Sequence, residues 1–325
     1  MGRKRQGNFD DPPRFHRKGN VWYHVSGSLP RKWSKLSDDR AEALRLWAKL
    51  EGVREDESTR LFSVIARRYM REILPTKAIA TRRDNERELA KLMGVFGEMP
   101  IDAIAPMHVR EYMDIRGEAA PVRANREKAL LSHIFNKARE WGYTVAINPC
   151  QGVKGFRETG RTRYVTDEEF TKVRAHAPPM LIDAMDIALL TGQRPADVLK
   201  LKRSNIRDGA LLITQNKTGA RLAIEIIGEL AEVIARIEAR PSSAISDFLI
   251  QDEHGQPLTE SRLRRRFDIA RDLAKVDFQF RDIRAKAASD TGDLAHSQKL
   301  LAHKNRQMTE HYVRSKIGER VKPLR

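Results

Sequence analysis

The middle of the chain has its apolar residues spaced as in amphipathic helices. From Leu61 onward they recur at helical intervals, and Pro75 ends the first of these helices. The same spacing predicts three further helices, which begin at a Thr81 cap, at Pro106 and at Pro121. Four helices with short loops predict a compact bundle over residues 58–153, and its apolar stripes are interpreted as core.

The first 57 residues have a different pattern. Segment 21–25 is rich in β-branched and aromatic residues, which predicts a short strand, and residues 32–36 are expected to form a second strand of a two- or three-stranded sheet. Ser37 is expected to cap a helix over about residues 38–51. Up to Lys35 the chain has nine basic residues against two aspartates, and Arg3, Lys4 and Arg5 lead this run. We interpret residues 1–57 as a small basic α+β module that binds DNA, with a solvated basic tail as the alternative.

The last part of the chain mixes helices with one hairpin. Thr166 and Glu169 have the spacing of a capping box, and residues 211–213 and 222–224 are expected to form strands joined by a turn that contains Lys217. Predicted helices lie near 180–190, from Pro195 through Leu201, and near 228–239, 259–274, 282–290 and 293–302. Before this domain, residues 154–163 are expected to be a basic linker whose Arg161 and Arg163 face DNA.

Composition narrows the classes of function. The chain has 325 residues with 61 Lys+Arg against 44 Asp+Glu, a net charge of +17, which is typical of a nucleic-acid-binding protein. The sequence has no run of about 18 apolar residues, so no membrane span is predicted. The basic N-terminus lacks the apolar stretch of a secretory signal. One cysteine excludes an internal disulfide and fits a reducing cytoplasm. No zinc cluster and no phosphate-binding glycine loop is present in the sequence.

Four separated motifs point to phosphate chemistry. They are Thr191–Asp197 with Arg194, the hairpin lysine Lys217, the segment 281–284 with Arg284, and the stretch 300–312 with His303 and Tyr312. Two guanidinium groups can bond the non-bridging oxygens of a phosphodiester whose negative charge grows in the transition state. Each residue alone is compatible with a structural role. Together and in this order, they predict a site where a tyrosine attacks phosphorus.

This ordered set resembles the tyrosine site-specific recombinases of the phage-integrase type, best over residues 164–316 and more weakly before them. The resemblance implies that Arg194 and Arg284 are the catalytic arginines, that Lys217 protonates the leaving 5′-oxygen, and that His303 hydrogen-bonds the phosphate. Tyr312 would be the nucleophile that forms a 3′-phosphotyrosine. Asp197 would have a supporting role, and Arg221 and His311 are poorer candidates for chemistry.

One position departs from the family pattern. The family usually has histidine three residues before the second arginine, where this chain has Arg281. An arginine stays protonated at neutral pH and cannot be a general base, although it can donate hydrogen bonds to phosphate. The substitution therefore bears on the rate of the reaction rather than on its type.

The resemblance also implies a domain organisation. The expected fold is multidomain and mainly α, with an arm-type DNA-binding module (1–57), a helical core-type DNA-binding domain (58–153), a linker (154–163) and a mixed α/β catalytic domain with a small antiparallel sheet (164–325). The expected DNA-facing residues of the bundle are Arg82, Arg83, Arg123 and Arg126.

The expected partners are double-stranded DNA attachment sites, further copies in a tetramer on DNA, a host DNA-bending protein and an excision factor. No cofactor and no metal are required, because the phosphotyrosine conserves the energy of the broken ester. A type IB topoisomerase, a decayed integrase that only binds DNA, and a purely structural helical protein are the alternatives.

Overall fold

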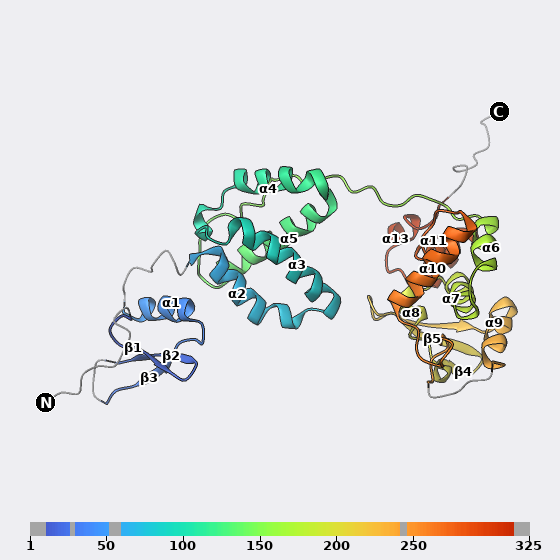
Figure 1. The fold of residues 1–325 in the computed structure, drawn as a ribbon, viewed down its shortest axis with the longest axis horizontal. Coiled ribbons are helices and arrows are strands. Elements are labelled where there is room, and N and C mark those ends of the chain that lie inside the picture. Colours follow the sequence, from blue (N-terminus) through green and yellow to red (C-terminus); the bar gives the residue numbers. More distant parts are fainter. Residues whose placement is uncertain (1–10, 27–29, 52–59, 241–245, 315–325) are drawn as a thin grey trace. The chain divides into compact units, whose positions relative to one another are not determined.

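The structure is a computed structural model that describes residues 11–26, 30–51, 60–240 and 246–314. It divides into two compact units, Met1–Thr159 and Gly160–Arg325. Figure 1 shows a small sheet with one helix and a helical bundle in the first unit, and helices around a second sheet in the other. Among the described residues, none of the helices has both the length and the apolar character needed to cross a bilayer.

The first unit begins with a three-stranded antiparallel sheet and one helix. The strands are β1 (Phe15–Lys18), β2 (Val21–Val25) and β3 (Trp33–Lys35) in the order β1-β2-β3, and helix α1 is Arg40–Glu51. Phe15 stacks on Trp22 with ring centroids 4.6 Å apart, and Ala43 of α1 completes this small core. The sequence predicted β2 and β3, and β1 is the third strand, which the prediction of a two- or three-stranded sheet left open.

The cap of α1 corrects one prediction. Asp39, not Ser37, accepts the backbone N–H of Glu42 in the first turn, at 2.9 Å. The Ser37 hydroxyl instead accepts the N–H of Asp39 and donates to the Glu42 carboxylate. The helix therefore begins two residues later than expected, because two neighbouring residues can each cap it and the aspartate takes the N-cap position.

Four helices form the rest of the first unit, as predicted. They are α2 (Phe62–Glu72), α3 (Ile79–Phe96), α4 (Pro106–Ala119) and α5 (Pro121–Glu140). Their inward residues, among them Phe62, Tyr69 and Phe96, form one continuous apolar core. The Thr81 cap was wrong: α3 starts at Ile79, so Thr81 lies inside its first turn, and the N-cap residue Ala78 has no side-chain acceptor.

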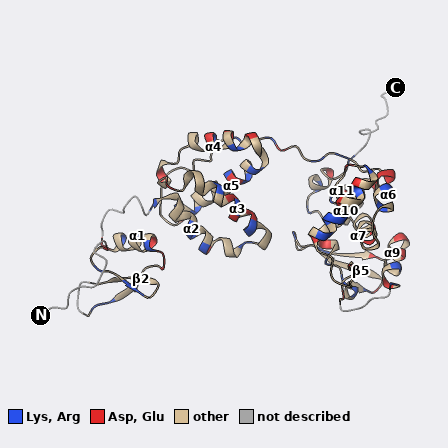
Figure 2. Ribbon diagram, viewed as in Figure 1, with Lys and Arg blue, Asp and Glu red and all other residues tan. Residues whose placement is uncertain are grey.

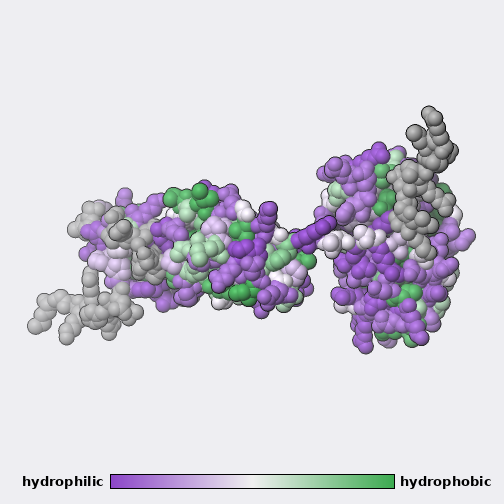
Figure 3. Space-filling model, turned by 90° about the horizontal axis from the view of Figure 1, so that it is seen from above, coloured by the Kyte–Doolittle hydropathy of each residue, from purple (hydrophilic) through white to green (hydrophobic). Residues whose placement is uncertain are grey.

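Figure 3 shows one face of the molecule, on which hydrophobic residues of the bundle come to the surface between hydrophilic ones. The bundle's exposed large apolar side chains include Val95, Met107 and Ile115. Most of the apolar stripe nevertheless faces inward, as predicted from its helical spacing.

The second unit packs helices against a three-stranded antiparallel sheet. The strands β4 (Ile206–Arg207), β5 (Ala210–Thr214) and β6 (Arg221–Glu225) are adjacent in that order. On β5, Leu211 and Ile213 are buried and Leu212 is exposed, so one face of the sheet packs on the core. The helices are α6 (Asp167–Ala175), α7 (Pro179–Thr191), α8 (Pro195–Val198), α9 (Gly228–Glu238), α10 (Glu260–Ala274), α11 (Asp282–Asp290), α12 (Leu294–Leu301) and α13 (Arg306–Glu310).

Predicted and observed bounds agree closely in this unit. The Thr166–Glu169 capping box is present at the start of α6, the two predicted strands form the hairpin, and α11 spans the expected residues. The helix from Pro195 was predicted to continue through Leu201 but ends at Val198. Leu199 and Leu201 are instead buried in the core beyond the helix end, so their apolar character reflects packing and not helical spacing.

Candidate active site

Arg194, Arg284, His303 and Tyr312 gather in the second unit although 118 positions separate the first from the last. The Arg284 guanidinium lies with its carbon 5.4 Å from the centre of the Tyr312 ring. One of its nitrogens is 3.2 Å from Nε2 of His303, and the rings of His303 and Tyr312 have centroids 5.2 Å apart. The structure thus brings the second arginine, the histidine and the tyrosine of the predicted set into mutual contact.

Arg284 is held by two helix ends. It is buried in α11 and donates to the carbonyl of Gly192, just after α7, at 2.5 Å and to that of Leu301, the last residue of α12, at 2.9 Å. Gly192 has a φ of +63°, which is the left-handed conformation that glycine adopts readily at a helix C-terminus. The Nε of Arg284 is also buried and has no partner within the described residues, so one N–H remains free to donate.

Arg194 precedes α8 and keeps most of its donors free. Its side chain is 21% exposed, donates to the Gln215 amide oxygen at 3.2 Å and lies 3.9 Å from the Asp197 carboxylate. Gln215 also donates to the Leu301 carbonyl at 3.1 Å, which is the acceptor used by Arg284. The two arginines are therefore connected through one glutamine and one carbonyl group.

Gln215 is a site residue that the sequence interpretation missed. It is buried and bonds Arg194, the Gln193 side chain and the Thr218 hydroxyl. Its position continues the inward alternation of Leu211 and Ile213 along β5, so a polar residue in an apolar register was the signal available in the sequence.

The two arginine charges act on each other and on the histidine. Burial first, and then the charge of Arg194, lower the pKa of Arg284 to about 10, so it remains a cation at neutral pH. Burial and the charges of Arg284 and Arg194 lower the pKa of His303 to about 4. His303 is therefore a neutral imidazole at pH 7. A site with two cations near a neutral base favours an anionic ligand.

The tautomer of His303 follows from its partners. Arginine only donates hydrogen bonds, so Nε2 of His303 accepts from Arg284. The proton is then on Nδ1, which donates to the Thr309 hydroxyl at 3.1 Å. Thr309 is fully buried in α13, and its carbonyl accepts the backbone N–H groups of Tyr312 and Val313. The histidine thus also helps to fix the segment that carries the tyrosine.

Lys217 and Arg281 lie apart from this contact cluster. Lys217 is exposed on the turn between β5 and β6, and within the described chain it has no hydrogen bond or ion pair. Its neighbour Asn216 donates its backbone N–H to Asp197 at 2.7 Å, so the base of the turn is tied to the helix that follows Arg194. Arg281 is exposed at the start of α11 and likewise has no partner in the described part of the chain.

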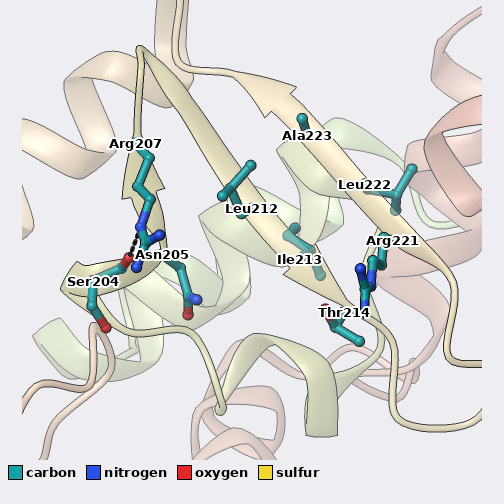
Figure 4. Close-up of a pocket in the computed structure, with 9 residues that line it drawn as sticks. All are labelled: Ser204, Asn205, Arg207, Leu212, Ile213, Thr214, Arg221, Leu222 and Ala223. Atoms are coloured by element: carbon teal, nitrogen blue, oxygen red, sulfur yellow. Dashed lines mark hydrogen bonds between the residues drawn. The ribbon is translucent and has the colours of Figure 1, made fainter.

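A hollow of about 570 Å³ lies on the open face of the second sheet. Figure 4 shows Arg207 turned toward the Ser204 carbonyl. It also shows Arg221, where β6 begins, beside Thr214, where β5 ends. Leu212 and Ala223 also line this hollow, which contains none of the four clustered residues. The cluster of four residues therefore lies outside this depression.

The predicted DNA-facing residues have varied surroundings. Arg83 and Arg123 are exposed, Arg82 donates to the Pro75 carbonyl, and Arg126 pairs with Glu158 at 2.8 Å. Arg161 and Arg163 pair with Asp282 and Glu169 in the second unit. Arg3, Lys4 and Arg5 lie outside the described residues. Figure 2 shows basic residues spread over both units, including α10.

The chain is similar to known proteins. Residues 169–318 match the family model described as the phage integrase family. The integrase of Escherichia phage HK022 is 28% identical over 71% of this chain and 70% of its own length. A prophage integrase of Escherichia coli K12 is 26% identical and covers 95% of this chain and 96% of its own.

Solved structures agree with this at the level of the fold. A lambda integrase dimer bound to a core site matches with a TM-score of 0.71 and 21% identity, over 98% of this chain and 99% of that one. The integrase of the Tn1549 transposon, in complex with circular intermediate DNA, matches with a TM-score of 0.64 and 16% identity, over 77% of this chain and 94% of that one.

Proposed function

Because this chain belongs to the phage integrase family, we propose that it is a site-specific DNA recombinase that cuts and rejoins DNA through Tyr312. The observation that supports this best is the contact of the Tyr312 ring with Arg284 and His303, with Arg194 connected to the same group through Gln215. A phosphodiester beside this tyrosine would meet two cations, of which Arg194 has the Asp197 carboxylate 3.9 Å away.

Arg194 and Arg284 would receive the non-bridging oxygens of the phosphate. Arg284 uses several of its N–H groups on the protein, so its free Nε and the more exposed Arg194 would supply the donors. Charge-assisted bonds of this kind strengthen as the phosphorus becomes five-coordinate, and loss of one such donor typically slows a reaction ~100- to 1000-fold.

The chemical step is a transesterification. The Tyr312 oxygen attacks phosphorus and forms a new P–O bond, while the bond from phosphorus to the 5′-oxygen breaks. The phenolic proton passes to water, and the leaving 5′-oxygen takes a proton from Lys217 on the hairpin turn. The 5′-hydroxyl of a second strand then attacks the phosphotyrosine and restores both the DNA ester and the free tyrosine, so bond energy is conserved.

His303 and Arg281 would have complementary roles. The incoming phosphate offsets the positive charges that lower the pKa of His303, which favours protonation and allows Nε2 to donate to phosphate. Arg281 cannot accept a proton at neutral pH, so it would contribute charge and hydrogen bonds in the position where the family usually has histidine.

The other domains would supply binding and assembly. We propose that the bundle residues Arg83 and Arg123 contact phosphates of the core site, and that the N-terminal module binds separate arm sites. Among the solved relatives, lambda integrase is a tetramer on a Holliday junction. For this chain we propose the same assembly on two duplexes in the cytoplasm, aided by a host DNA-bending protein and an excision factor.

A suicide-substrate assay tests this function. Purified protein is incubated in EDTA with a nicked duplex that carries its attachment core, beside Tyr312→Phe and Tyr164→Phe, the second being a tyrosine outside the cluster. The expected result is a covalent protein–DNA band that only Tyr312→Phe loses. If the wild-type protein binds this duplex but forms no adduct, the enzyme proposal is wrong and the DNA-binding alternative replaces it.

An assay for relaxation of supercoiled plasmid distinguishes a recombinase from the topoisomerase alternative. A recombinase acts on its own sites, so we expect no relaxation of plasmids that lack them. Efficient relaxation of any plasmid, with no recombinant product from paired sites, would favour the topoisomerase.

A further inference from the structure

Asp282 is a buried carboxylate next to the catalytic cluster that the chemistry above does not use. Its side chain is 1% exposed at the start of α11, between Arg281 and Arg284. It accepts the backbone N–H of Gln279 at 2.9 Å and pairs with Arg161 at 2.9 Å and with Arg314 at 3.1 Å. The hydrogen bonds and the two arginines hold its pKa below the ordinary value, so it is an anion at neutral pH.

The two arginines come from segments with different roles. Arg314 follows the proposed nucleophile by two residues, and Arg161 belongs to the linker that enters the second unit. Arg314 also donates to the carbonyl of Arg163 at 2.8 Å, and its backbone N–H donates to the Ser289 hydroxyl of α11 at 2.8 Å. The linker and the nucleophile segment are thus bound to the same carboxylate and to each other.

Backbone packing adds a second contact between these segments. A Cβ atom placed on Gly160 would lie 3.3 Å from Nε2 of His311, which precedes Tyr312 directly. Residues 160–163 of the linker therefore run beside residues 311–314, with contacts at Gly160 and at Arg163. Displacement of residues 160–163 would be transmitted to the tyrosine through these contacts.

We propose that Arg161, Asp282 and Arg314 form a clamp that positions Tyr312 and makes its placement depend on the interdomain linker. The proposal rests on the nucleophilic role of Tyr312 and adds regulation of that site. Asp282 and the two arginines are positioning residues, because they act through the segment and not on the phosphate. DNA binding that moves the linker would then place the nucleophile for cleavage or withdraw it.

Amide hydrogen exchange on the DNA-free, full-length protein tests the clamp itself. The amides of Tyr312, Val313 and Arg314 are bonded to Thr309 and Ser289. Hydrogen bonds to charged groups are strong, so Arg161→Gln and Arg314→Gln should each accelerate exchange in this segment by about tenfold or more. Arg306→Gln is the matched control, because it removes an exposed pair with Glu310 one turn before the tyrosine. Unchanged exchange in the Arg161 variant would overturn the proposal.

Single-turnover cleavage at saturating protein then tests the positioning role. A small displacement of a reacting group costs up to about 100-fold in rate, so we expect Arg161→Gln and Arg314→Gln to be ~10- to 100-fold slower at unchanged fraction bound. Arg314→Lys, which keeps the charge, should recover part of the rate, and Arg306→Gln should match the wild type. Faster exchange with unchanged cleavage would refute the positioning role. Absence of an adduct in the wild type would instead refute the function, while exchange still reports on the clamp.

Discussion

Acidification should destabilise the second unit through His303. The folded-state pKa of about 4 lies below the ordinary value of 6.5, so the unfolded chain binds more protons between these values. The neutral imidazole's contribution is therefore fully present above about pH 6.5 and is lost as the pH falls toward 4. From pH 7 to pH 5 the linkage relation gives a loss of about 2 kcal/mol.

The expected loss of stability arises from the contact between His303 and Arg284. Protonation of Nε2 removes the acceptor that Arg284 uses at 3.2 Å and places a third positive charge beside Arg284 and Arg194. In His303→Gln a neutral amide oxygen can still accept from Arg284, and no charge develops on acidification. The variant should therefore lose about 2 kcal/mol less than the wild type between pH 7 and pH 5.

Urea unfolding provides the assay, with an internal control. All four tryptophans, at positions 22, 33, 47 and 141, lie in the first unit, so their fluorescence follows that unit alone. Far-UV circular dichroism reports on both units. With a denaturant dependence of about 2 kcal/mol per molar urea, the midpoint of the second unit should fall by ~1 M more in the wild type than in His303→Gln. Equal pH dependence in the two proteins would refute the reasoning.

Three further outcomes are expected. Gln215→Leu removes the acceptor that orients Arg194, so single-turnover cleavage should slow by ~10- to 100-fold at unchanged DNA affinity, whereas equal rates would argue against this orienting role. Thr166→Ala removes the capping hydroxyl of α6 and should lower the stability of the second unit by ~1 kcal/mol in circular dichroism, with the tryptophan transition unchanged. Burial raises the pKa of Cys150 to about 12, so the thiol should resist an aromatic disulfide reagent at pH 8 until urea unfolds the first unit; rapid labelling of the folded protein would contradict this.

Local signals in the sequence predicted most of the elements. Proline placed the starts of α4 and α5, and the Thr166–Glu169 pair placed the start of α6. These signals work because caps and proline act within one turn of a helix. Caps were predicted less well: near Ser37 the neighbouring Asp39 makes the capping hydrogen bond, and α3 begins before Thr81 without a side-chain cap.

The candidate site was also predicted only in part from the sequence. The family resemblance named Arg194, Arg284, His303 and Tyr312, and the structure brings three of them into contact and joins the fourth through Gln215. The glutamine was missed because its importance depends on facing Arg194 and the Leu301 carbonyl across the fold. The domain boundaries and the DNA-facing residues remain predictions.

The sequence by itself determined the helical pattern, the basic charge and the order of the candidate site residues, because these depend on spacing and composition. Tertiary structure alone decided how each charged group is used. Arg284 is largely committed to two carbonyl groups, Arg194 is left more open, and Asp282 joins the linker residue Arg161 to Arg314, near Tyr312. The reason is that hydrogen bonds and charge interactions act over a few ångströms in space, and residues more than 100 positions apart become neighbours only when the chain folds.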